Sequence, residues 1–135
     1  MNLSELIETI RIETTVNEKW EDPNYLSELL VRLASYYSTL GKPLAEAEQN
    51  EDFAKLNYEL VRERFKVERV EAGDSVALAE SKAAVQVKLD KDEWANSKYK
   101  ARLLFLTRQS LDKTMDALRS RLSYIKMDRE GARIS

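Results

Sequence analysis

The sequence contains neither cysteine nor histidine, and this absence excludes several kinds of functional site. Zinc sites with thiolate or imidazole ligands cannot form, so only carboxylate metal sites remain open. The most common catalytic base and the most reactive side-chain nucleophile are missing as well, and there is no Gly-rich phosphate loop. We therefore expect no catalytic residues, no cofactor and no metal ion. The lack of disulfides fits a reducing compartment.

Long apolar runs are also absent. The first residues, MNLSE, lack the basic start and apolar stretch of a signal peptide. No segment approaches the roughly 20 apolar residues that are needed to cross a bilayer. We therefore expect a protein without a membrane partner, located in the cytoplasm.

Turn-forming residues are scarce, with only 3 glycines and 2 prolines in 135 residues. This is too few for an all-β fold with frequent turns, whereas apolar spacing and capping residues predict helices over 3–13, 22–40, 43–72, 76–88 and 92–127. Gly41 and Pro43 are expected to separate the second helix from the third. We predict an all-α fold, an elongated bundle of about five helices with long, coiled-coil-like third and last helices. Residues 1–135 should form a single domain, in which residues 1–20 could be an N-terminal arm.

The last predicted helix carries the clearest pattern. Apolar residues alternate three and four positions apart from Ala101 to Ile125, and only Arg108 interrupts them. Such a stripe is typical of a coiled coil or a bundle. It could pack on the protein's own helices or join identical subunits, and the sequence leaves both open. The candidate subunit interface consists of Leu104, Leu111, Met115, Leu118, Leu122 and Ile125.

Basic residues gather in the C-terminal part. Residues 1–53 hold 4 Lys and Arg against 11 Asp and Glu, whereas residues 54–135 hold 18 against 13. Such a segregated basic part could attract a polyanion, or it could pair with the acidic helices. The candidate nucleic-acid contacts on the third predicted helix are the cations Arg62, Arg64, Lys66 and Arg69, together with Phe65, on which a base could stack.

Three segments resemble the UvsY family of phage recombination mediators. Residues 115–126, MDALRSRLSYIK, are similar to the family's C-terminal run of Leu-Asp-Ala-Ile-Lys-Ser-Arg followed, after three variable residues, by Ile-Lys. Residues 33–40, LASYYSTL, lie where the family has a Tyr-Ser-x-x-Leu helix. Residues 62–65, RERF, lie where the family has Lys-x-Arg followed by Leu. The order of segments agrees over roughly residues 25–127, and the first twenty residues match no part of the family.

The resemblance implies a homo-oligomer that binds single-stranded DNA. It would help a phage recombinase displace the single-strand-binding protein, in the cytoplasm of a bacterial host. The family's Lys-x-Arg pair, tied to DNA contact, corresponds to Arg62 and Arg64, although Glu63 between them lowers the local positive charge. The alternative is a homo-oligomeric helical structural or adaptor protein of a phage that does not bind DNA.

Overall fold

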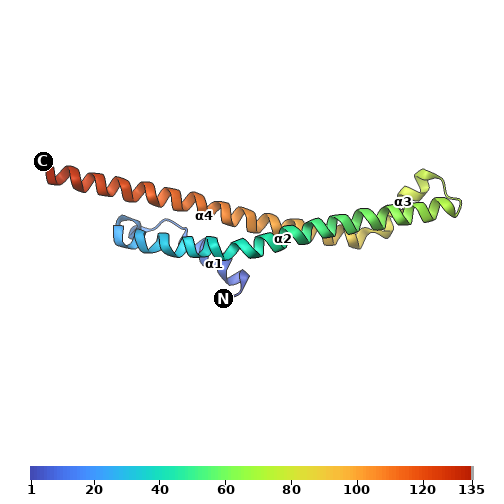
Figure 1. The fold of residues 1–135 in the computed structure, drawn as a ribbon, viewed down its shortest axis with the longest axis horizontal. Coiled ribbons are helices and arrows are strands. Elements are labelled where there is room, and N and C mark those ends of the chain that lie inside the picture. Colours follow the sequence, from blue (N-terminus) through green and yellow to red (C-terminus); the bar gives the residue numbers. More distant parts are fainter. Residues whose placement is uncertain (135) are drawn as a thin grey trace. The chain divides into compact units, whose positions relative to one another are not determined.

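The computed structural model is all-α (Figure 1). It describes the backbone of residues 1–134 and the side chains of residues 1–131. In chain order the elements of this part are α1 (Leu3–Glu13), the short 3-10 helix η1 (Glu18–Glu21), α2 (Pro23–Glu71), α3 (Val76–Gln86) and α4 (Lys88–Ile134). The predicted fold class is thus confirmed, and its two long helices are α2 and α4.

The chain divides into two compact units, and both long helices pass through both of them. Unit 1 contains residues 1–42 and 104–135, and unit 2 contains residues 43–103. Unit 1 thus holds α1, η1, the first part of α2 and the larger part of α4. Unit 2 holds the rest of α2, all of α3 and the start of α4. The expectation of a single domain stays a prediction.

The helix ends follow the local signals in the sequence. Asn2 caps α1 in a capping box with Glu5, in which each side chain bonds to the other residue's backbone N–H. Asp22 precedes Pro23 at the start of α2, and its carboxylate accepts a hydrogen bond from the Asn24 N–H. These caps satisfy backbone donors that the first helical turn leaves without partners.

Gly73 ends α2 as predicted. Its φ angle of 105° is one that side chains with a Cβ rarely adopt. The N–H groups of Gly73 and Asp74 bond back to the carbonyls of Val70 and Arg69, which is a Schellman motif. Ser75 then caps α3 by accepting a bond from the Leu78 N–H. The four residues 72–75 therefore form the turn between α2 and α3.

The predicted break between residues 40 and 43 is wrong, because α2 continues through Gly41 and Pro43. A proline inside a helix removes one backbone hydrogen bond and crowds the carbonyl four residues earlier. The helix tolerates this because Leu40 before the proline is buried in unit 1, and Leu44 and Ala47 after it are buried in unit 2. The predicted second and third helices are therefore one 49-residue helix.

The contacts of Arg108 explain why it can interrupt the apolar stripe. Its guanidinium carbon lies 4.0 Å from the centre of the Tyr37 ring, and its Nε donates to the Tyr37 carbonyl at 3.2 Å. A Cβ on Gly41 would lie 3.4 Å from Arg108 Nη2, which is an ordinary contact distance, so the guanidinium packs close to this turn of α2. The half-buried Arg108 thus takes a position of the apolar stripe by stacking on a ring.

The apolar stripe of α4 packs inside unit 1. Leu104, Leu111, Met115 and Leu118 are buried, as are Leu26, Leu29, Leu33 and Leu40 of α2 and Leu6 and Ile10 of α1. Apolar area withdrawn from water contributes about 25 cal/mol per Å², so this leucine-rich core is the main source of stability in unit 1.

We predict that Arg108→Ala lowers the free energy of unfolding by about 1–3 kcal/mol, because a cation–π contact and a hydrogen bond are lost together. Arg108→Lys should not restore the loss, since an ammonium group cannot stack on Tyr37 as a planar guanidinium does. Urea denaturation measures both changes. The matched control is Arg119→Ala, which removes an exposed pair with Asp116 and should change stability by less than about 0.5 kcal/mol. Equal effects of Arg108→Ala and Arg119→Ala would contradict this account.

Candidate nucleic-acid interface

The predicted DNA-contacting residues all lie on the part of α2 that belongs to unit 2. Arg62 and Arg64 are exposed, and within the described part of the chain neither forms an ion pair or a side-chain hydrogen bond. Their guanidinium groups are therefore available to an external anion. Planar guanidinium groups bind phosphate oxygens in a bidentate manner, which suits these two residues to phosphate contacts.

Phe65 lies in an open groove between α2 and α3. The half-buried ring shares the groove with two cations, Arg69 and Lys82, with the apolar Val85 and with polar groups. The groove has a volume of about 520 Å³, within the range of sites that hold small organic ligands. No carboxylate lines it. The full lining is Phe65, Arg69, Ser81, Lys82, Val85 and Gln86.

Asp74 holds both cations of this groove. Its Oδ2 accepts hydrogen bonds from Arg69 Nε at 2.7 Å and from Lys82 Nζ at 2.9 Å. The bond from Arg69, and next the bond from Lys82, hold the pKa of the Asp74 carboxyl below its ordinary value of 3.8. One carboxylate shared by two cations leaves a net positive charge beside Phe65. The sequence placed Asp74 only in a turn and did not single out Lys82, because Arg69 and Lys82 lie on different helices and meet only at Asp74.

The structure also gives Lys66 an acidic partner. Lys66 Nζ lies 3.1 Å from Glu80 Oε1 of α3. The Glu80 side chain is about half exposed, so salt and water screen the attraction. Of the four cations predicted on this helix, two are therefore unpaired among the described side chains, and two already have a carboxylate partner. The pair of Lys66 with Glu80 connects α2 to α3, and the pair of Arg69 with Asp74 connects α2 to the turn that follows it.

Other aromatic and basic side chains of unit 2 divide between packing and solvent. Trp94 stacks on Tyr58, with ring centres 5.5 Å apart, and Lys55 lies over the Trp94 ring at 5.9 Å. Side chains of the same unit therefore cover at least one face of this indole. Lys98 and Lys100 of α4 are exposed and, among the residues the structure describes, have no ion-pair partner.

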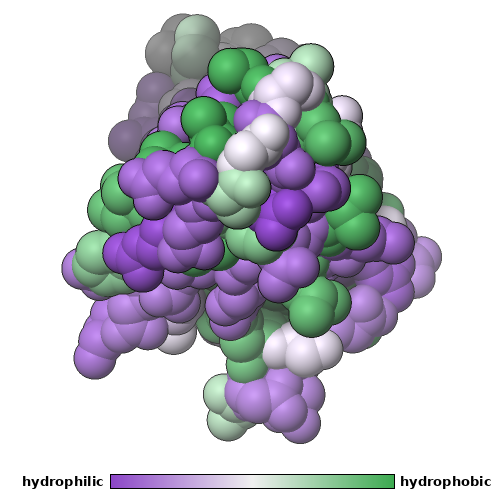
Figure 2. Space-filling model, turned by 90° about the vertical axis from the view of Figure 1, so that its right-hand side faces the viewer, coloured by the Kyte–Doolittle hydropathy of each residue, from purple (hydrophilic) through white to green (hydrophobic). Residues whose placement is uncertain are grey.

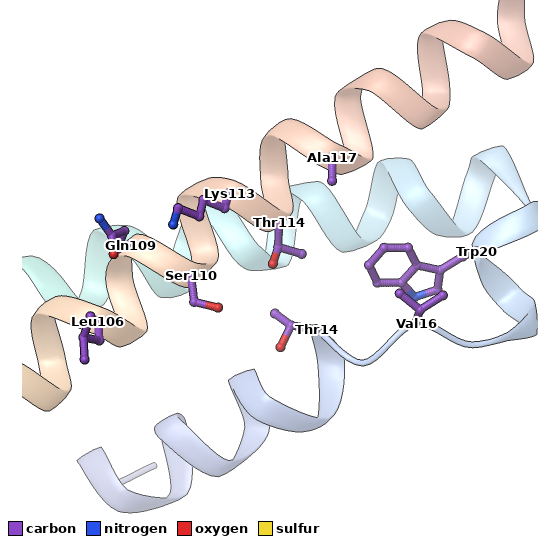
Figure 3. Close-up of a pocket in the computed structure, with 9 residues that line it drawn as sticks. All are labelled: Thr14, Val16, Trp20, Leu106, Gln109, Ser110, Lys113, Thr114 and Ala117. Atoms are coloured by element: carbon purple, nitrogen blue, oxygen red, sulfur yellow. The ribbon is translucent and has the colours of Figure 1, made fainter.

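Unit 1 contains a second groove, which the sequence did not predict (Figure 3). The Trp20 ring, supplied by η1, and Val16 lie opposite α4, from which Ser110, Lys113 and Thr114 line the groove. An indole wall with a lysine and hydroxyl groups, and no carboxylate in the lining, is suited to an aromatic anion such as a nucleotide. A tryptophan in a short 3-10 helix has no periodic signal, which is why sequence reasoning missed it.

The residues predicted to join subunits need a correction. Leu104, Leu111, Met115 and Leu118 are between 0% and 4% exposed, because α1 and α2 of the same chain cover them. Nothing of these four side chains remains for a second subunit, so the reading in which the stripe packs on the protein's own helices holds for them. Leu122 and Ile125 are half-buried and line a groove with Pro23.

Two further findings concern metals and membranes. In the described part of the chain, no three acidic side chains are grouped so that they could hold a metal ion. Among the same residues, none of the helices combines the length and apolar character that a membrane span requires.

We predict that Asp74→Asn destabilises the protein at neutral pH and not at strongly acidic pH. A carboxyl whose pKa is lowered on folding stabilises the native state above its ordinary value of 3.8, and this contribution is lost as the pH falls through the lowered value. Thermal unfolding of both proteins across this pH range tests it. A stability difference that persists unchanged in acid would mean that the charge of Asp74 is not its source.

No family model, no curated protein and no solved structure matches this chain. The resemblance to the recombination mediators thus rests on residues 33–40, 62–65 and 115–126, and it stays a prediction.

Proposed function

We propose that this protein binds single-stranded DNA as a homo-oligomer and acts as a recombination mediator, which helps load a strand-exchange recombinase. The observation that carries the DNA-binding part is the groove at Phe65, where an accessible aromatic ring lies beside Arg69 and Lys82 and no carboxylate lines the surface. Stacking of a base on an aromatic ring contributes about 1–3 kcal/mol and tolerates any base. Such a contact requires an unpaired base, so it favours single strands.

The unpaired cations supply the second part of the argument. Arg62 and Arg64 lie just before Phe65 on α2 and have no carboxylate partner among the described side chains. Each phosphate that such a cation neutralises releases condensed counterions, which drives association and makes it weaken with added salt. A few contacts per subunit give only modest affinity, and several copies on one strand multiply it. Sequence-independent binding of this kind suits a protein that must hand the strand to a recombinase.

The mediator role rests on the family resemblance. The recombinase and the displaced single-strand-binding protein are its expected protein partners. The absence of histidine and cysteine supports a binding protein rather than an enzyme.

A second candidate is a self-associating structural or adaptor protein that does not bind DNA. The pairing of Lys66 with Glu80, and of Arg69 with Asp74, favours it, because those cations already have an acidic partner. The two candidates differ in whether a labelled oligonucleotide binds at low salt.

We predict that Arg62→Ala combined with Arg64→Ala weakens binding of a fluorescent single-stranded oligonucleotide and flattens its salt dependence. Each lost phosphate contact should reduce the slope of log K against log salt by about 0.7. The charge-matched control is Arg11→Ala with Arg119→Ala, since each of these arginines pairs with a carboxylate three residues away. Affinity that is unchanged in the first double variant, or equally reduced in the control, would refute the assignment. No binding of the unaltered protein at low salt would favour the adaptor.

We further predict that Asp74→Asn increases DNA affinity by several-fold at neutral pH, because it frees Arg69 and Lys82 for phosphate. The same change lowers stability, so a purely structural role of the cluster predicts weaker binding instead. Fluorescence anisotropy at a temperature where both proteins are folded separates the two. Weaker or unchanged binding would show that these two cations do not contact DNA.

A further inference from the structure

Unit 2 buries small side chains and exposes large ones. Four of its six buried apolar residues are alanines, namely Ala47, Ala79, Ala83 and Ala101, and the others are Leu44 and Val87. Figure 2 views the molecule from the end at which α2 turns into α3, and apolar groups reach the surface there between polar ones. Since stabilisation scales with the apolar area that leaves water, this unit gains little from its own core.

Several of the large exposed apolar side chains of unit 2 lie together on one helix. Five of them follow one face of α2 with heptad spacing, and Glu63 fills the remaining position. Their exposed fractions lie between 40% and 61%. We call this the outer face of α2, and it consists of Phe53, Leu56, Leu60, Val67 and Val70.

The same helix has a second heptad stripe, which the chain itself covers. Positions 44, 47, 51, 54, 58, 61 and 65 are buried or half-buried, in the same spacing and over the same length. A helix with two apolar stripes can satisfy one within its own chain, and the other requires another helix. Among the side chains that the structure describes, none covers the outer face enough to bury it.

The charges that flank the outer face indicate what covers it. In a parallel pair of identical helices, charged residues five positions apart on either side of the stripe meet across the interface. This brings Glu59 to Arg64, and Lys66, which also pairs with Glu80 of its own chain, to Glu71. A guanidinium has several N–H donors, so Arg64 can meet Glu59 of the second copy and still bind a phosphate. In an antiparallel pair, Glu59 meets Lys66. Neither arrangement places like charges opposite each other on the flanks, so the face is complementary to itself.

We propose that the outer face of α2 packs against the outer face of a second copy of the chain. This inference names the surface through which the proposed homo-oligomer assembles. It rests on the homo-oligomer of the proposed function and not on DNA binding. Glu63 is the one charged residue in the stripe. It weakens the pairing, which keeps assembly reversible.

The first test is the mass of the full chain in solution without DNA, by analytical ultracentrifugation. The unaltered protein should self-associate, and Leu56→Ser with Leu60→Ser should raise the dissociation constant at least tenfold. The matched control is Val85→Ser with Leu89→Ser, which removes two side chains that are more exposed and lie off this face. Glu63→Leu should lower the dissociation constant at least tenfold, because it completes the apolar stripe.

Cysteine variants locate the contact directly, since the chain has no cysteine of its own. In a parallel pair Val70→Cys should form a disulfide with itself. In an antiparallel pair the two copies of position 70 lie about 25 Å apart, and only a mixture of Val70→Cys and Phe53→Cys should cross-link. Either cross-link supports the proposal.

Three results would overturn it: a monomer at all concentrations, an assembly unaffected by the Leu56 and Leu60 changes, or no cross-link from either experiment. Because these measurements contain no DNA, their failure is distinct from a failure of DNA binding. Far-ultraviolet circular dichroism of each variant establishes that lost association is not lost folding.

Discussion

The apolar stripe of α4 packs against helices of its own chain, and this packing decides which charged side chains lie on the surface of unit 1. Leu104, Leu111 and Leu118 leave water almost completely by packing in the core of unit 1. Once this stripe is covered, the lysines and arginines beside it are fixed around that core, where some of them meet acidic groups. Arg121, for example, donates to Glu21 of η1. The cations that remain unpaired are therefore a product of the packing rather than of composition alone.

The cores of the two units consist of side chains of different size. Unit 1 has three helical segments that bring leucines and isoleucines together, so its core consists of large side chains. In unit 2 the small residues of α3 let the helices approach closely, and the large residues of α2 remain outside. A close approach between helices buries less apolar area than a leucine-rich contact of equal length. Unit 2 therefore depends more than unit 1 on what surrounds it.

Local signals predicted the helix ends around residues 71–76 well, but α4 begins at residue 88 rather than 92 and extends to 134 rather than 127. Long-range packing could not be predicted from local signals. The turn at Gly73 and the cap at Ser75 depend on a few neighbouring residues, so the sequence located both. Gly41 and Pro43 carry the same kind of signal but lie inside α2, because burial on both sides outweighs a missing hydrogen bond. Only tertiary structure could show this.

The sequence predicted the cations of the candidate site on α2, but it did not predict their ion pairs. The pattern of charge identified Arg62 and Arg64 on α2, and both are exposed. It could not show that Asp74 would meet Arg69 or that Glu80 would meet Lys66, because Asp74 lies in the turn after α2 and Glu80 lies on the next helix. It also left open whether the α4 stripe makes subunit contacts or packs internally, since heptad spacing is the same in both.

The carboxylate of Asp74 has a consequence for how a strand could be released. It holds Arg69 and Lys82 in place when no ligand is present, so a nucleic-acid backbone that engages them replaces one anion by another. The exchange costs little rearrangement in either direction, because the groove is already shaped and its internal anion remains alongside to take the cations back. In the function that we propose, such a site would hold a strand loosely and let it leave intact, as transfer from one protein to the next requires.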